Sequence, residues 1–222
     1  MTGSDLSTGL DPQAVADLAA PPEKASVLII ACGALAREII DINRLNGWSH
    51  VAVTCLPANL HNRPDQIPDR LREKIRKNKD SYETIAVAYA DCGTGGMIRK
   101  VVDEEGATMM AGPHCYSFFA GASVFDEIAE QELGTFYLTD YLARHFETLI
   151  VKGMGLDKYP GMRDMMFGNY KRVVYFAQVE DPEVDRLAEA AAERLGLAYE
   201  KRVTGYGELA SFMTDMAEKH SA

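Results

Sequence analysis

The 222-residue chain has few basic residues, no long apolar run and no C-x-x-C motif. Its 23 Lys and Arg stand against 33 Asp and Glu, and the net charge of −10 argues against a nucleic-acid partner, because binding phosphates requires clustered positive charge. No segment reaches the roughly 18 apolar residues of a membrane-spanning helix, so we expect no membrane association. Residues 1–24 lack a basic region followed by an apolar one, so they do not predict a secretory signal, and we expect a cytoplasmic protein.

The pattern along the chain predicts an α/β fold with parallel strands. A flexible N-terminal tail, residues 1–24, precedes a single α/β domain over residues 25–222. Three strand–helix–strand (βαβ) units follow one another in this domain, and they form either one doubly wound sheet or a pseudo-threefold arrangement of small sheets. The predicted strands are residues 27–31, 51–54, 84–90, 108–111, 172–177 and 198–203. Residues 116–168 are predicted to be mostly helical, with a helix start at Thr135 or Thr139.

Each of the first two units carries two cysteines at the same spacing, Cys32 with Cys55 and Cys92 with Cys115. The first cysteine of each pair follows a hydrophobic run and directly precedes a glycine. Because ligands bind at the carboxyl ends of parallel strands, we expect several thiols to gather at one edge of a sheet. Disulfides rarely persist in the cytoplasm, so these thiols indicate metal binding or catalysis. The alternative is that cysteine acts as a small buried hydrophobe, which applies most to Cys55.

The predicted metal ligands are Cys32, Cys92, Cys115 and His114. Three thiolates, with or without a histidine, form a soft donor set suited to zinc or an iron–sulfur cluster. His114 adjoins Cys115 in a Gly-Pro-His-Cys turn, and His61 lies in a loop beyond a strand end. Either histidine can be the fourth ligand or a catalytic partner, and the sequence leaves both open. Ligands so far apart along the chain favour an open, functional site over a structural one.

A glycine-rich turn follows the first cysteine of each pair and is predicted to open a helix. The helix dipole and the backbone N–H groups there favour an anion, so they lower the pKa of a thiol at Cys32 or Cys92. The same geometry suits a phosphate, which is the competing interpretation. The residues that would bind such a cofactor are Gly33, Gly93, Thr94 and Gly95. Asp91, which precedes Cys92, is a candidate catalytic carboxylate.

Five motifs of the chain carry a family resemblance: CGAL at 32–35, LHN at 60–62, DCGTG at 91–95, GPHCY at 112–116 and GTFYLTD at 134–140. They resemble an uncharacterised prokaryotic family, the domain of unknown function numbered 1638, over roughly residues 26–215. Cys55 stands where an ordinary strand residue is expected in that family. Members are often encoded beside corrinoid-dependent methylamine or betaine methyltransferases, so the resemblance implies a role in one-carbon metabolism.

The function expected from these observations is that of a metal–thiolate protein of methylamine metabolism, acting as a methyl-group transferase on a small-molecule substrate. Corrinoid or tetrahydrofolate is the expected co-substrate, and a corrinoid protein or a methyltransferase the expected partner. Three alternatives stay open. The protein could handle metal or corrinoid without catalysis, it could be an iron–sulfur lyase, or its glycine turns could bind a phosphorylated ligand.

Overall fold

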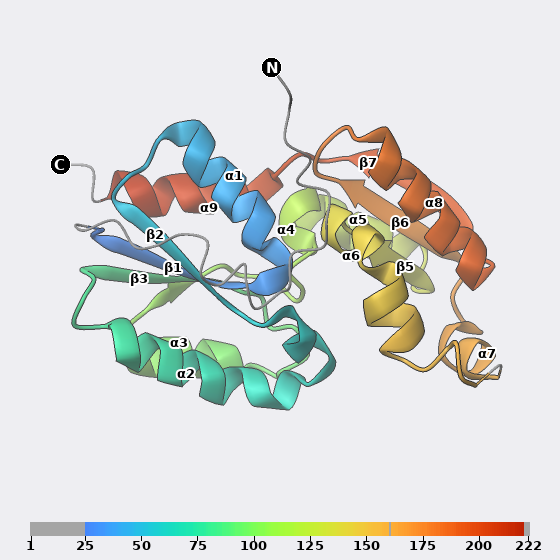
Figure 1. The fold of residues 1–222 in the computed structure, drawn as a ribbon, viewed down its shortest axis with the longest axis horizontal. Coiled ribbons are helices and arrows are strands. Elements are labelled where there is room, and N and C mark those ends of the chain that lie inside the picture. The colour runs from blue at the N-terminus through green and yellow to red at the C-terminus, as the bar shows by residue number, and fades with distance from the viewer. Residues whose placement is uncertain (1–24, 160, 220–222) are drawn as a thin grey trace, which may run out of the picture. The chain divides into compact units, whose positions relative to one another are not determined.

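The computed structural model describes residues 25–159 and 161–219, and the predicted tail, residues 1–24, lies outside them. In these ranges strands alternate with helices, and every strand pairing is parallel (Figure 1). The predicted parallel α/β class is therefore confirmed. The described strands form two sheets, one of four strands and one of three, which differs from the single sheet and from the three sheets that the sequence left open. The first two βαβ units share one sheet, because the first strand pairs with strands on both of its sides.

The chain divides into two compact units. The first unit holds the described residues up to Tyr89, together with Thr94–Met109 and the residues from Met216 onward. The second unit holds Ala90–Gly93 and Met110–Asp215. The sequence predicted a single domain over residues 25–222, and its strand–helix–strand pattern gives no sign of this division.

The sheet of the first unit has the strand order β2-β1-β3-β4. Its strands are β1 (Val27–Cys32), β2 (Val51–Leu56), β3 (Thr84–Ala88) and β4 (Thr108–Met109). Val27 pairs with Val51 on one side and with Thr84 on the other, so β1 is the central strand. All six residues of β1 are buried, as its continuous apolar run predicts for a strand covered on both faces.

Helices cover both faces of this sheet. They are α1 (Ala36–Asn46), α2 (Ile67–Asn78) and α3 (Met97–Glu105), with 3-10 helices at Gly33–Leu35, Ala58–Asn62 and Pro64–Gln66. Helices α2 and α3 lie on one face and α1 on the other (Figure 1). Arg72 on α2 forms ion pairs with Glu104 at 2.6 Å and Glu105 at 2.9 Å, which joins α2 to α3.

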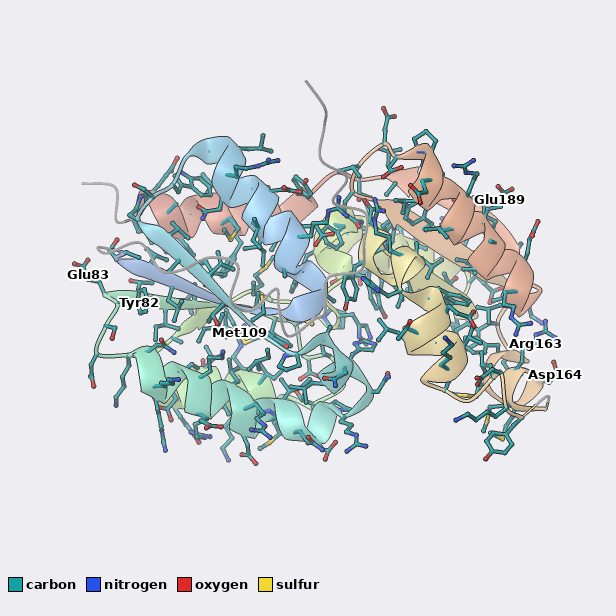
Figure 2. The ribbon with its side chains drawn as sticks, viewed as in Figure 1. Tyr82, Glu83, Met109, Arg163, Asp164 and Glu189 are labelled. Atoms are coloured by element: carbon teal, nitrogen blue, oxygen red, sulfur yellow. The ribbon has the colours of Figure 1, made fainter. Side chains whose placement is uncertain are left out.

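The sheet of the second unit has the order β5-β6-β7. Its strands are β5 (Thr135–Leu138), β6 (Arg172–Ala177) and β7 (Ala198–Val203). Its helices are α4 (Ser117–Ala120), α5 (Ala122–Gln131), α6 (Asp140–Arg144), the π-helix Glu147–Lys152, α7 (Met162–Phe167), α8 (Pro182–Leu195) and α9 (Gly207–Glu218), whose last residues belong to the first unit. Arg163 Nε donates a hydrogen bond to the carbonyl of Leu195 at 2.8 Å and so attaches α7 to the end of α8 (Figure 2).

Strand β5 was not predicted from the sequence, which indicated mostly helix over residues 116–168. The four residues of β5 are too few to show a strand periodicity, and they become a strand by pairing with β6.

The predicted helix start at Thr139 is confirmed, because its hydroxyl accepts a hydrogen bond from the backbone N–H of Leu142 and caps α6. Thr135, the other predicted start, belongs to β5.

No helix in the described ranges is both long and apolar enough to cross a membrane.

Candidate functional site

The two cysteines that follow β3 and β4 lie side by side in the second unit. The Sγ atoms of Cys92 and Cys115 are 3.2 Å apart, and we call these two residues the thiol pair. Backbone hydrogen bonds hold their turns together: Asp91 N–H donates to the carbonyl of Gly112 at 3.1 Å, and Cys92 N–H donates to the carbonyl of Pro113 at 2.9 Å. The two turns thus continue beyond the strands as a short paired segment that brings the sulfurs into contact.

The backbone of Cys92 is in a conformation that favours glycine. Among the described residues it is the one non-glycine residue with a positive φ, 48°. A side chain in this region costs roughly 1–2 kcal/mol, because the β-carbon approaches the carbonyl oxygen of the chain. Gly93, which follows with a φ of 79°, meets no such cost. A residue held in this region by its surroundings is characteristic of functional sites.

The glycine-rich turn leads into helix α3 at Met97, as the sequence predicts. The prediction that Cys92 itself lies at the start of this helix is wrong, because the N-cap is Gly96. Gly95 and Gly96 have φ values of 62° and 85°, so the turn passes through left-handed conformations before the helix can form. The dipole of a helix acts only near its first turn, and Cys92 lies before the first turn of α3. The predicted effect of the helix dipole on the Cys92 thiol is therefore absent.

Four stacked rings extend from the thiol pair into the second sheet, and we call them the aromatic column. His114 stacks on Tyr116 with ring centroids 4.9 Å apart, Tyr116 stacks on Tyr137 at 5.2 Å, and Tyr137 stacks on Phe176 at 5.6 Å. Tyr137 lies on β5 and Phe176 on β6. Because Cys115 stands between the first two residues of the column in sequence, the column fixes its backbone against the sheet.

The phenol of Tyr116 lies in an environment that disfavours its ionised form. Burial raises its pKa above the usual range, and the negative charges available to Tyr137, Cys92 and Cys115 raise it further. Tyr116 therefore stays protonated at neutral pH. In this state it can donate a hydrogen bond, and it adds no negative charge beside the sulfurs.

The other two cysteines lie in the first unit and are buried. Cys32 is the last residue of β1, is 5% exposed and precedes the 3-10 helix Gly33–Leu35. Cys55 lies within β2 and is 4% exposed. Burial raises the pKa of the Cys55 thiol to about 12, with a smaller contribution from Cys32 and an opposing one from Lys74. At neutral pH Cys55 is thus a thiol and not a thiolate, as the packing interpretation requires.

The glycine of the Cys32-Gly33 step has a packing role. A β-carbon at Gly33 would lie 2.9 Å from the backbone nitrogen of Ala58 and 3.0 Å from the carbonyl oxygen of Leu56. The chain that follows β2 therefore passes so close to Gly33 that no side chain fits at this position. By contrast, a β-carbon at Gly93 or Gly95 would meet no atom within 4 Å, so these two predicted cofactor-binding glycines border open space.

The predicted site residues are divided between the two units. Cys32, His61, Thr94 and Gly95 belong to the first unit, and Asp91, Cys92, Gly93, His114 and Cys115 to the second. His61 lies in the 3-10 helix Ala58–Asn62; its side chain is exposed, yet partial loss of hydration lowers the pKa of its imidazole. No group of three or more His, Cys, Asp or Glu residues within residues 25–159 and 161–219 is arranged to hold a metal ion. Of the three predicted thiol ligands, two meet in the thiol pair.

Sequence reasoning missed a buried carboxylate at the edge of the second sheet. Asp140 is 5% exposed; its carboxylate accepts hydrogen bonds from the Tyr175 hydroxyl at 2.7 Å and from the backbone N–H groups of Gln178 and Val179, each at 3.1 Å. These contacts join the end of β5 to the end of β6. The signal that could have revealed it is an aspartate placed directly after a threonine predicted to begin a helix. It also missed that the ring of Tyr116 stacks on His114 beside the thiol pair.

The model of a family described as a protein of unknown function (DUF1638) matches residues 55–213. The chain belongs to this family. The matched range contains the thiol pair, the aromatic column and both candidate histidines, whereas Cys32 and β1 precede it. No curated protein matches the chain.

Proposed function

We propose that this member of the DUF1638 family binds a soft metal, as zinc or as the iron of an iron–sulfur cluster, through the thiol pair and uses it in methyl-group transfer. The observation that carries the proposal is the 3.2 Å separation between the sulfurs of Cys92 and Cys115. Two thiolates about 2.3 Å from one tetrahedral zinc lie about 3.8 Å apart. The pair would therefore need to open by only about 0.6 Å, which small side-chain rotations supply.

The thiol pair supplies two ligands, so the proposal needs further donors. His114 is the neighbour of Cys115, and a neutral imidazole suits zinc or iron. The sequence names Cys32 and His61 as further candidates. A centre with fewer than four protein ligands leaves a position for substrate.

The methyl-transfer part of the proposal is supported by the chemistry of the donors and by the family resemblance. A metal held by thiolates acts as a Lewis acid that activates a thiol or water bound to it. Asp91, adjacent to Cys92, is the candidate to accept the proton that such an acceptor loses. Corrinoid or tetrahydrofolate, the co-substrates that the resemblance implies, would supply or receive the methyl group.

The test is metal analysis and an absorption spectrum of protein purified without air or chelator. We expect near-stoichiometric zinc, or iron with sulfide, in the unsubstituted protein and in the control Cys55→Ser. We expect loss of the metal in Cys92→Ser and Cys115→Ser. Parallel analysis of Cys32→Ser, His61→Ala and His114→Ala identifies the remaining ligands. A protein that stays metal-free after reconstitution with zinc, or with iron and sulfide, contradicts the proposal.

A second candidate function is non-catalytic handling of a metal or corrinoid, and the exposure of the thiol pair favours it. Cys92 and Cys115 are each half-buried, whereas Cys32 and Cys55 are buried. A partner could therefore reach the pair to exchange metal. Removal of the metal by a chelator within minutes, with no methyl transfer by the loaded protein, would support this function; slow removal together with turnover would exclude it.

A further inference from the structure

The two sulfurs of the thiol pair lie close together, and both cysteines are partly accessible to solvent. The sulfurs are 3.2 Å apart, and both residues are half-buried. Cys92 lies between β3 and α3, and Cys115 lies between β4 and α4, so neither belongs to a strand or a helix. Both thiols therefore lie in turns, outside the packed strands and helices.

The sulfurs of the pair are only slightly farther apart than those of a disulfide. A disulfide requires its sulfurs about 2.05 Å apart, so the pair would approach by about 1.2 Å. The backbone hydrogen bonds from Asp91 to Gly112 and from Cys92 to Pro113 already hold the two turns together in the dithiol form. The conformational entropy of bringing the two cysteines together has thus been lost on folding, which favours an intramolecular disulfide over mixed disulfides with small thiols.

We propose that Cys92 and Cys115 are a site of reversible oxidation, in which they form a disulfide by exchange with a low-molecular-weight disulfide and thereby lose the ability to bind metal. The formation of the disulfide follows from the geometry of the pair alone, whereas its effect on metal binding rests on the proposed function.

The chemistry balances without any further oxidant. One thiolate of the pair attacks the small disulfide RSSR, forming a mixed disulfide and releasing one RS⁻. The second thiolate then attacks the protein sulfur of the mixed disulfide, forms the Cys92–Cys115 bond and releases a second RS⁻. The two protons leave with the released thiols, so the protein loses two hydrogens and RSSR is reduced to two RSH. Excess dithiol reverses both steps.

The first experiment treats metal-free protein with oxidised glutathione and maps the products by mass spectrometry. We expect a protein lighter by two hydrogens, with a cross-link between Cys92 and Cys115 that dithiothreitol removes. Cys92→Ser and Cys115→Ser should instead accumulate a mixed disulfide with glutathione on the remaining cysteine, because the second step is missing. Cys55→Ser should behave as the unsubstituted protein does.

Two outcomes would contradict the proposed disulfide. They are a stable mixed disulfide in the unsubstituted protein and a cross-link that involves Cys32 or Cys55. Both are read from the unsubstituted protein, so poor folding of a serine variant does not remove the test. Circular dichroism of each variant shows whether its folding is intact.

The second experiment adds zinc to the oxidised and to the reduced protein and measures the zinc retained after gel filtration. We expect about ten-fold less zinc on the oxidised protein, restored by reduction, because the sulfurs of a disulfide no longer bind the metal as thiolates. Equal zinc on both forms would refute the regulation while leaving the disulfide intact. No zinc on the reduced protein would refute the proposed function, and the disulfide would still stand or fall by the first experiment.

Discussion

The two cysteine pairs have the same spacing in sequence but opposite surroundings. In the first unit, Cys32 pairs with Leu56 and Cys55 pairs with Ala31 across β1 and β2. Paired residues of neighbouring parallel strands share a face, and successive residues alternate, so these two thiols point to opposite faces of the sheet. In the second unit, Cys92 and Cys115 lie beyond their strands in turns, where alternation no longer applies, and their sulfurs meet at 3.2 Å.

This difference shows that a repeated spacing predicts repeated elements and not repeated chemistry. A shift of one residue in register separates two thiols inside a sheet, whereas two turns can bring them together. The buried pair therefore suits packing and the turn pair suits reactivity. Substitutions at both pairs and at their neighbouring glycines test this contrast.

The largest effect is expected from the ionisation of Cys55 at high pH. Its pKa is raised to about 12 in the folded protein, against an ordinary value of 9.0, because burial disfavours the thiolate. The folded state therefore binds the proton more tightly than the unfolded state does. The contribution of the protonated Cys55 thiol to the free energy of unfolding is therefore fully present below about pH 9. As the pH rises from about 9 toward about 12, the free energy of unfolding falls by up to about 1.4 kcal/mol per pH unit.

Urea unfolding at a series of pH values, compared between the unsubstituted protein and Cys55→Ala, measures this contribution. The difference in the free energy of unfolding between the two proteins should shrink as the pH rises above 9. Cys115→Ala is the matched control from the thiol pair. Curves for the unsubstituted protein and Cys55→Ala that stay parallel would refute the burial of an un-ionised thiol at Cys55.

An intermediate effect is expected from the glycines that follow the first cysteine of each pair. Gly33→Ala places a β-carbon 2.9 Å from a backbone nitrogen, so the chain must shift, and we expect a loss of about 2–3 kcal/mol of stability. Gly93→Ala meets no atom within 4 Å but has a φ of 79°, and the backbone strain alone should cost about 1 kcal/mol. Thermal unfolding ranks the two; a larger loss for Gly93→Ala would contradict the packing role of Gly33.

The smallest effect is expected from Cys92→Gly, and its sign is unusual. Glycine adopts the φ of 48° without strain, so this variant should be more stable by about 0.5–1 kcal/mol while losing metal binding and disulfide formation. Cys115→Gly, at a position without a positive φ, should lose stability instead. Chemical denaturation of both variants gives the measurement. A destabilised Cys92→Gly would show that the cysteine side chain contributes more to packing than its backbone costs.

Much of the fold could be predicted from local patterns. The apolar run of β1 predicts a buried strand, and Asp181 and Gly196, the N-cap and the C-cap of α8, are residue types that favour the two ends of a helix. Strand β5 could not be predicted, because four residues carry no periodicity and their pairing with β6 is a long-range contact.

The candidate site was predicted only in part, for a similar reason. The positions of Cys92, His114 and Cys115 beyond strand ends followed from the sequence. The contact between the sulfurs and the left-handed conformation of Cys92 did not, because both depend on hydrogen bonds between turns that are distant along the chain.

By itself, then, the sequence determined the parallel α/β class, most of the strands and helices, and that Cys92, His114 and Cys115 lie beyond strand ends, because these depend on residues close together in the chain. Only the tertiary structure decided that Cys92 and Cys115 meet, that Cys32 and Cys55 are buried, and that the strands form two sheets. These outcomes depend on register and burial, which arise from contacts between segments far apart in sequence.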